Sequence, residues 1–384
     1  MSRIVVLGSG AWGTALALSL HRRGGHQVTL WAHSPEAAVE IAEPRENTLF
    51  LPGFPIPAEI AITGNEAAVA EADIVLSVVP SEFLRPTLAR LGPHLHSGQI
   101  IVSATKGVED KTFLRITEVI AQALGKVAER EGAISPVTEE SRPVSGHDFS
   151  RAAEPAKPNR AGRGGFQPTH YSPEASFPGI PIGALSGPSF AVEVAQAQPT
   201  AVTVAFADPQ VAARIQSEFS SETLRLYTST DVIGVELGGA LKNVIAIAAG
   251  IAAGIGLGHN SAAALMTRGI AEITRLAIAC GGRRETLAGL SGVGDLVLTC
   301  TGSLSRNRTV GEALGHGRNL PEILESLGGK VAEGVRTTRA ALGLARLHTI
   351  EMPITEQMEL ILDEGKDPRQ AIRELMLRPG KDER

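Results

Sequence analysis

Two stretches of the sequence combine residue types and spacings that point to chemistry. The first is residues 8–13, Gly-Ser-Gly-Ala-Trp-Gly, which follow the apolar run of residues 3–7. In such a turn the first glycine permits a sharp bend, the second lets the backbone approach a pyrophosphate, and the third lets helix and strand pack closely. The helix that begins there would present unpaired N–H groups and the positive end of its dipole to phosphates. Gly8, Gly10 and Gly13 therefore predict a dinucleotide-binding turn.

The second stretch, residues 239–243, places Lys242 in an apolar segment with no other Asp, Glu, Lys or Arg between Glu236 and Arg268. Exclusion from water lowers the pKa of an ammonium group, and such a lysine can exchange protons near neutral pH. A lysine on a solvated helix face is the alternative. Asp295, within Gly-Val-Gly-Asp-Leu, could pair with this amine or accept a hydrogen bond from a substrate hydroxyl.

A third polar cluster, Ser-Arg-Asn-Arg at residues 305–308, has the residue types that bind phosphate. Arginine offers paired donors, and Ser or Asn at the start of a helix adds further ones. For each residue taken alone, an ordinary structural use is an equal alternative.

The segment after the second predicted strand bears on the choice of cofactor. NAD-selective sites have Asp or Glu at the end of this strand to bind the ribose hydroxyl. This sequence has Trp-Ala-His-Ser at residues 31–34, with no carboxylate to repel a 2′-phosphate. We therefore expect NADP to be accepted as well as NAD, with His33 and Arg45 as candidate partners of the phosphate. A surface role for either residue is the alternative.

Composition limits the class of protein. Apolar residues make up 43% of the 384 residues, enough for sizeable cores, and the formal net charge of -5 predicts no basic surface for nucleic acid. The two cysteines, Cys280 and Cys300, cannot build a disulfide framework and fit a cytoplasmic location. No His or Cys cluster has the spacing of a metal site, and no secretory signal is visible. The uncharged run 243–267 is rich in Gly and Ala, which favours a buried helix over a membrane-spanning one.

Hydrophobic periodicity predicts an α/β protein of two domains. Short apolar runs predict buried strands at residues 3–7, 27–31, 73–79, 100–104, 182–185, 201–205 and 224–227. Helical patterns alternate with them, which predicts a parallel, doubly wound Rossmann-type sheet over residues 1–228. Only helical patterns follow, and residues 229–384 therefore predict an all-helical substrate domain, with helices at 232–254, 261–279, 309–314, 320–326, 337–347 and 354–362. Residues 126–181 have the composition of an unfolded linker inserted in a surface loop.

Taken together, the motifs resemble the bacterial NAD(P)-dependent glycerol-3-phosphate dehydrogenase family over nearly the whole chain outside that insertion. The matching segments are residues 8–17, 103–107, 185–191, 239–244, 267–269, 294–296, 305–308 and 333–335. The resemblance implies the reversible, NAD(P)H-dependent reduction of dihydroxyacetone phosphate to sn-glycerol 3-phosphate, which feeds phospholipid synthesis. The site is expected between the sheet domain and the helical domain.

The resemblance also implies roles for individual residues. Lys242 matches the proton donor and acceptor, and Lys106 matches a lysine that contacts both substrate and nicotinamide. The positions that match substrate contacts are Lys106, Gly187, Ser189, Lys242, Asp295, Ser305, Arg306 and Asn307. The positions expected to contact the cofactor are Gly8, Gly10, Ala11, Trp12, Gly13, His33, Phe50, Lys106, Ala191, Arg306, Val331 and Glu333. The family often has Tyr where this chain has Phe50, which lacks the hydroxyl.

Two other functions fit parts of the same pattern. A hydroxy-acid or ketopantoate reductase shares the two-domain plan, and Arg306 could hold its carboxylate. A nucleotide sensor without activity would lack the lysines, whereas Lys106 and Lys242 are both present. The lysines and residues 305–308 together favour the triose phosphate. The expected partners are the small-molecule substrate and a second copy of the chain in a homodimer; no metal, nucleic acid or membrane segment is expected.

Overall fold

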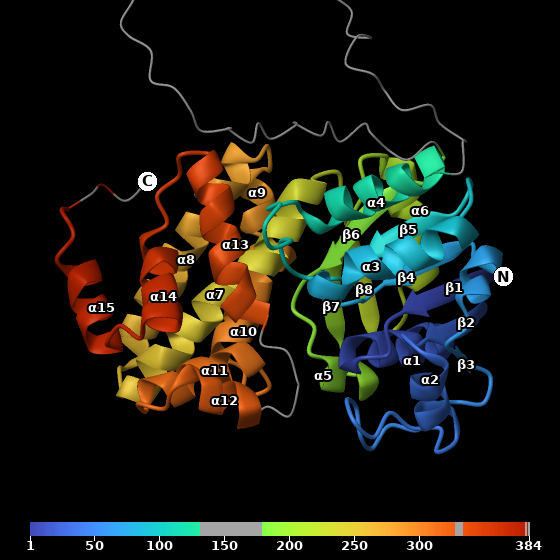
Figure 1. The fold of residues 1–384 in the computed structure, drawn as a ribbon, viewed down its shortest axis with the longest axis horizontal. Helices are drawn as coiled ribbons and strands as arrows, with labels where there is room; N and C mark the ends of the chain where they lie inside the picture. Colours follow the sequence, from blue (N-terminus) through green and yellow to red (C-terminus); the bar gives the residue numbers. More distant parts are fainter. Residues whose placement is uncertain (131–178, 327–332, 381, 383–384) are drawn as a thin grey trace, which may run out of the picture.

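The N-terminal part of the chain is built on one eight-stranded sheet (Figure 1). The computed structural model describes residues 1–130, 179–326, 333–380 and 382. The strands are β1 (Ser2–Leu7), β2 (His26–Trp31), β3 (Ala61–Thr63), β4 (Ile74–Ser77), β5 (Ile100–Ser103), β6 (Ile182–Ser186), β7 (Thr200–Ala205) and β8 (Leu224–Ser229). Their order across the sheet is β3-β2-β1-β4-β5-β6-β7-β8. The order reverses between β1 and β4, so the carboxyl ends of these strands border the crevice in which doubly wound sheets bind ligands.

The direction of the strands changes once across the sheet. All neighbours from β3 to β6 are parallel, β6 and β7 are antiparallel, and β7 and β8 are again parallel. The prediction of a wholly parallel sheet was therefore wrong at β6–β7. The link between these strands contains only α5 (Ala191–Ala195), and a helix of 5 residues is too short to return the chain along the sheet.

Helices cover both faces of the sheet, as Figure 1 shows. The remaining helices of this part are α1 (Ala11–Arg23), α2 (Pro35–Ala42), α3 (Ser81–Leu91), α4 (Ile116–Arg130), α6 (Pro209–Phe219) and the 3-10 turns η1 (Glu66–Glu71) and η2 (Gly92–His94). Because side chains alternate along a strand, Ile4 and Val6 join the core under α1, α5 and α6, while Val5 and Leu7 join the core under α3 and α4.

The C-terminal part is helical and surrounds one long central helix, α7 (Val232–Ile255). The other elements are α8 (His259–Ala279), α9 (Arg284–Leu287), the π-helical turn η4 (Leu290–Gly294), α10 (Asp295–Thr301), α11 (Arg306–Gly315), α12 (Leu320–Ser326), α13 (Glu333–Leu347), α14 (Pro353–Glu364) and α15 (Pro368–Met376). Within the described ranges, α7 has the length and apolarity of a membrane span, but 89% of its most apolar window is buried inside the protein. Its apolar side chains are the core of the helical part.

Glycines let α7 and α11 approach each other closely. A Cβ at Gly250 would collide with the carbonyl of Arg308, and one at Gly311 would collide with the carbonyl of Ile247. Any larger side chain at these two positions would push the helices apart. The glycines therefore fix α11 against the C-terminal half of α7.

Most predicted elements lie within a few residues of the observed ones, with two kinds of exception. The short β3 and the helices α9, α10 and α15 were not predicted. The proposed linker also began too early and ended too late, because α4 continues to Arg130 and Ile180 is fully buried in the core with α4. The rest of that prediction concerns residues 131–178, which lie outside the described residues.

Candidate active site

The glycine turn has the geometry of a dinucleotide cradle. Gly8 follows β1 with φ of 110°, and a Cβ there would lie 3.0 Å from the carbonyl oxygen of Val78, at the end of β4. A Cβ at Gly13 would collide with the carbonyl oxygen of Gly8, whereas nothing lies within 4 Å of a Cβ at Gly10, the N-cap of α1. The turn is therefore closed where strand and helix meet and open where a pyrophosphate would approach the helix N-terminus.

An asparagine missed by the sequence analysis holds the loop beside this turn. The Asn47 amide donates to the carbonyl of Ser9 at 2.7 Å and to the Thr14 hydroxyl at 2.8 Å, and its own carbonyl accepts from the backbone N–H of Phe50. Asn47 is 1% exposed, while Phe50 is 40% exposed beside it. Phe50 is thus tied to the glycine turn and remains accessible to a ligand. Ala11 and Trp12, at the start of α1, are partly exposed.

Arg45, a candidate partner of a cofactor phosphate, has contacts of its own in the structure. Its guanidinium donates to carbonyl oxygens within the loop 56–60, so Arg45 holds that loop. His33 is exposed just after β2. Arg90 of α3 reaches this place, 5.9 Å from the centroid of the Trp31 ring and 3.4 Å from the carbonyl oxygen of His33. Its sequence position, far from β2, gave no signal of this.

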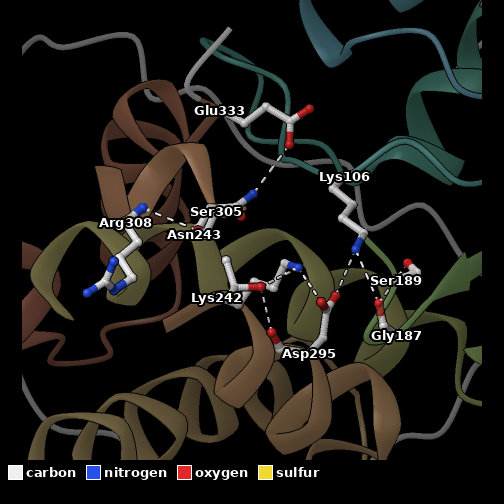
Figure 2. Close-up of polar contacts among 10 residues, drawn as sticks. Lys106, Gly187, Ser189, Lys242, Asn243, Asp295, Ser305, Arg308 and Glu333 are labelled. Atoms are coloured by element: carbon white, nitrogen blue, oxygen red, sulfur yellow. Dashed lines mark hydrogen bonds and ion pairs between the residues drawn. The ribbon is translucent and has the colours of Figure 1, made fainter. Parts of the chain in front are cut away.

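Two lysines from different parts of the chain meet on one carboxylate (Figure 2). Lys106, in the loop after β5, donates to Asp295 at 2.8 Å and to the carbonyl of Gly187 at 3.4 Å. Lys242, in the middle of α7, pairs with the other oxygen of the same carboxylate. Asp295 is 0% exposed and Lys242 is 6% exposed. The buried position of Lys242 confirms a desolvated amine, and its pairing with Asp295 confirms one of the two alternatives for that residue.

Thr299 is the fourth member of this cluster, after Lys106, Lys242 and Asp295. The sequence analysis did not identify it. Its hydroxyl accepts from the Lys242 amine at 2.8 Å and donates to the backbone carbonyl of Asp295 at 2.6 Å. Both residues lie on α10, one turn apart, and side chains at this spacing share a helix face. That spacing is the signal that could have identified Thr299.

Burial and charge separate the proton affinities of the two lysines. Burial lowers the pKa of Lys242 to about 7, with Asp295 opposing this effect and Lys106 adding to it. Burial also acts on Lys106, but the charge of Asp295 and the hydrogen bond to it raise the pKa of Lys106 above its usual value. Lys106 therefore stays a cation near neutral pH, while Lys242 can take up and release a proton.

Gly187 and Ser189, which follow β6, lie next to the cluster of the two lysines and Asp295. Gly187 has φ of 148°, and its carbonyl accepts from Lys106 and, at 3.1 Å, from the Ser189 hydroxyl. Both residues therefore lie beside Lys106, where a substrate contact is expected. Ala191 begins α5 and is partly exposed.

The start of α11 and the start of α13 border the cluster on the other side. The Ser305 hydroxyl caps α11 by accepting from the N–H of Arg308 at 3.2 Å, and the Asn307 carbonyl accepts from the N–H of Gly334 at 3.0 Å. Arg306 is exposed at the first position of α11. Its side chain is the accessible cation of residues 305–308, because Arg308 pairs with Glu312.

Glu333 also faces this site, at the first position of α13. Its carboxylate accepts from the Asn243 amide at 3.3 Å (Figure 2). Burial raises the pKa of Glu333, against the attraction of Arg306, Lys106 and Lys242. The site therefore combines acidic and basic groups from α7, α10, α11, α13 and the loop after β5. Val331, the remaining predicted contact, lies outside the described residues.

The arrangement can transfer a proton and hold an anion next to a dinucleotide. An ammonium whose pKa is near 7 matches the demand of general acid catalysis at neutral pH. The free N–H groups at the start of α11, with Arg306, can bind a phosphate. No group of three or more His, Cys, Asp or Glu side chains suited to a metal ion occurs among the residues that the structure describes.

Comparison with known proteins assigns the chain to a family. The model of the N-terminal part of NAD-dependent glycerol-3-phosphate dehydrogenase matches residues 3–135 and 173–212, and that of the C-terminal part matches residues 231–373. A glycerol-3-phosphate dehydrogenase [NAD(P)+] from Koribacter versatilis is 52% identical over 99% of this chain and 98% of its own. One from Acidobacterium capsulatum is 51% identical over 100% of both chains.

A solved structure agrees with the family models. The crystal structure of glycerol-3-phosphate dehydrogenase from Coxiella burnetii is 36% identical and covers 98% of this chain and 99% of its own, with a TM-score of 0.81. The matches span both the sheet with its glycine turn and the helices that carry Lys242 and Asp295. This chain therefore belongs to the NAD-dependent glycerol-3-phosphate dehydrogenase family.

Proposed function

We propose that the protein is an NAD(P)-dependent glycerol-3-phosphate dehydrogenase in which Lys242 moves the proton of the reaction. It interconverts dihydroxyacetone phosphate and sn-glycerol 3-phosphate and supplies phospholipid synthesis. The observation that carries this proposal is the Lys242–Asp295–Lys106 cluster beside an open dinucleotide turn, in a chain of this family.

Reduction of the ketone needs a hydride at carbon and a proton at oxygen. When bound, the reduced nicotinamide supplies the hydride. Lys242 donates its proton to the carbonyl oxygen as negative charge develops there, and the neutral amine is stable because its pKa is about 7. Lys106 remains charged and stabilises the developing negative charge. In the reverse direction Lys242 accepts the proton of the alcohol.

The phosphate of the substrate is held at the start of α11. Arg306 supplies a guanidinium, and the first turn of α11, capped by Ser305, supplies N–H groups and the positive end of the helix dipole. Asn307 has its carbonyl engaged by Gly334, so its amide N–H groups are the part that can contact the phosphate. Binding the phosphate there orients the ketone for both transfers.

The cofactor lies along the carboxyl edge of the sheet. The proposed contacts are Gly8, Gly10, Ala11, Trp12, Gly13, His33, Phe50, Lys106, Ala191, Arg306, Val331 and Glu333. Support comes from the open face at Gly10 and the exposed positions of His33 and Phe50. Because no carboxylate ends β2, we expect both NADP and NAD to serve.

The same proposal covers the organisation of the chain. Residues 1–228 form the dinucleotide domain and residues 229–384 the substrate domain, which is supported by the end of β8 at Ser229 and the start of α7 at Val232. We expect a cytoplasmic enzyme without an integral membrane segment or nucleic acid partner. A homodimer is the proposed assembly.

The direct test is an assay of NAD(P)H absorbance with dihydroxyacetone phosphate, run with each cofactor and with ketopantoate as the competing substrate. Lys242→Ala should abolish turnover, because the other cation of the cluster, Lys106, has a raised pKa and holds its proton more tightly than Lys242 does. NADPH binding, followed by fluorescence, should stay within about twofold of wild type, because Lys242 is not among the proposed cofactor contacts. Full activity of this variant, or faster reduction of ketopantoate, would refute the proposal.

A further inference from the structure

A buried ion pair joins the loop that carries Lys106 to the helix that carries Lys242. We call residues 104–115, between β5 and α4, the Lys106 loop. At the end of this loop Arg115 donates to the carboxylate of Glu236, on α7, at 2.6 Å. The two residues are 121 positions apart in sequence and are each 8% exposed. The catalytic mechanism described above uses neither of them.

Every polar atom of the Glu236 carboxylate is engaged by the same short segment. One oxygen accepts from the backbone N–H of Thr117 at 2.7 Å, and the other accepts from the Thr117 hydroxyl at 2.8 Å as well as from Arg115. Arg115 in turn donates to Glu118 at 2.7 Å. Such directional contacts fix both the rotation of α7 and its position along its axis relative to the Lys106 loop.

The position of Arg115 affects that of Lys106 because contacts within the Lys106 loop hold its two ends together. Val108 and Arg115 form an antiparallel bridge. Across the same loop the backbone N–H of Glu109 donates to the carbonyl oxygen of Leu114 at 2.9 Å. The Glu109 carboxylate is held by the Arg85 guanidinium at 2.7 and 2.8 Å. Arg115 therefore cannot move without moving the segment that begins at Lys106.

On the other side, Glu236 precedes Lys242 by less than two turns of one helix, about 9 Å along its axis. Between them Gly239 leaves room for the neighbouring strand: a Cβ there would collide with the Ser186 hydroxyl and would lie 4.0 Å from Cγ of Lys106. The aliphatic stem of Lys106 therefore passes over α7 at Gly239, between the ion pair and the amine of Lys242.

We propose that the Arg115–Glu236 pair is a positioning pair, which sets the place of Lys106 relative to Lys242 on the shared carboxylate of Asp295. Apolar residues of equal size could bury the same surface, but they would not fix the register of the loop on the helix. The pair acts on the reaction only through Lys106. The inference rests on the proposed roles of Lys106 and Lys242.

The test compares Glu236→Gln with Glu272→Gln as a matched control. Glu272 is also a buried carboxylate of the helical part and accepts from the N–H groups of Ile354 and Thr355, but it has no contact with the Lys106 loop. We expect Glu236→Gln to lower kcat about 10- to 100-fold, the range produced by misplacing a catalytic group by about 1 Å. The affinity for NADPH should change less than kcat does, because Lys106 is one of many proposed cofactor contacts. Glu272→Gln should keep the wild-type kcat and affinity for NADPH.

The pH profile separates positioning from a loss of stability. The titratable and polar groups that face Lys242 are Asp295, Thr299 and Cys300 from α10, Lys106 from its loop and Glu333 from the start of α13. When Lys106 is displaced, Lys242 loses a repelling charge and keeps Asp295, so its pKa rises. In Glu236→Gln the fall of the reduction rate with pH should therefore move to higher pH, and in Glu272→Gln it should not move.

A second variant keeps the test decisive if Glu236→Gln does not fold. Arg115→Lys retains the charge with fewer donors, and it should give a kcat between those of wild type and Glu236→Gln, with the same direction of pH shift. A lower unfolding temperature with wild-type kcat and pH profile in either variant would overturn the positioning role. That result would leave the proposed function intact, whereas an active Lys242→Ala variant would overturn the function itself.

Discussion

Asp295 offers the sharpest quantitative prediction, because one buried carboxylate serves two lysines. In Asp295→Asn the side chain keeps its shape but loses its charge. An opposite charge in hydrogen-bonding contact accounts for about 1 to 3 pKa units. The pKa of Lys242, about 7 in the wild type, should therefore fall to between about 4 and 6.

The consequence for the rate follows from the protonated fraction of Lys242. With a pKa of about 7, about half of the amine is protonated at pH 7. With a pKa of about 6 the fraction is about a tenth, and with a pKa of about 4 it is about a thousandth. Reduction needs the protonated form, so kcat at pH 7 should fall by about 5- to 500-fold, or about 1 to 4 kcal/mol of activation free energy.

The assay is the pH dependence of kcat for dihydroxyacetone phosphate reduction. The reduction rate falls as pH rises through the pKa of Lys242, so the lower pKa moves this fall to lower pH, by about 1 to 3 units. The gap between variant and wild type should accordingly narrow as the pH is lowered. Thr299→Val is the control, because it removes a hydrogen bond to Lys242 without removing a charge. A fall that stays at the wild-type pH in Asp295→Asn would show that this carboxylate does not control the proton affinity of Lys242.

Two further predictions address the anion site and the dinucleotide turn. Arg306→Ala should raise the KM for dihydroxyacetone phosphate about 10-fold or more, by loss of a charge-assisted contact, and an unchanged KM would remove Arg306 from the phosphate site. Gly13→Ala should weaken NADPH binding more than about 10-fold, since its Cβ would collide with the Gly8 carbonyl and open the turn; a wild-type Kd in a fluorescence titration would contradict the proposed cradle.

Much of the fold could be predicted because its elements have strong local patterns. The strands β1, β4 and β5 are continuous apolar runs, as buried parallel strands must be. The direction of β7 could not be predicted in the same way, since an antiparallel strand buried on both faces has the same apolar residues. The deciding feature is the length of α5, and a helix of five residues gives no periodic signal.

The candidate site divides along similar lines. Lys242 was identified because a lone charge in an apolar helix is visible in the sequence, and its burial confirmed that interpretation. The contacts of Arg45 could not be predicted, because the sequence does not show which acceptors a guanidinium finds; it binds carbonyl oxygens of the loop 56–60. The Arg115–Glu236 pair joins residues 121 positions apart, and no local sequence pattern predicts a contact over such a separation.

The single reversal of strand direction has a consequence for how the chain tolerates change in length. Because β7 and β8 run opposite to β6, α7 begins at the edge of the sheet where the first six strands start. From there α7 runs along β6 in the same direction. The rise from Val232 to Lys242, about 15 Å, is close to the length of β6 from Ile182 to Ser186, about 13 Å. One residue inserted between Val232 and Lys242 would rotate the Lys242 amine by about 100° around the helix axis and shift it by about 1.5 Å along that axis. Relatives of this chain should therefore have no insertions or deletions in the N-terminal half of α7, whereas the lengths of their surface loops should differ.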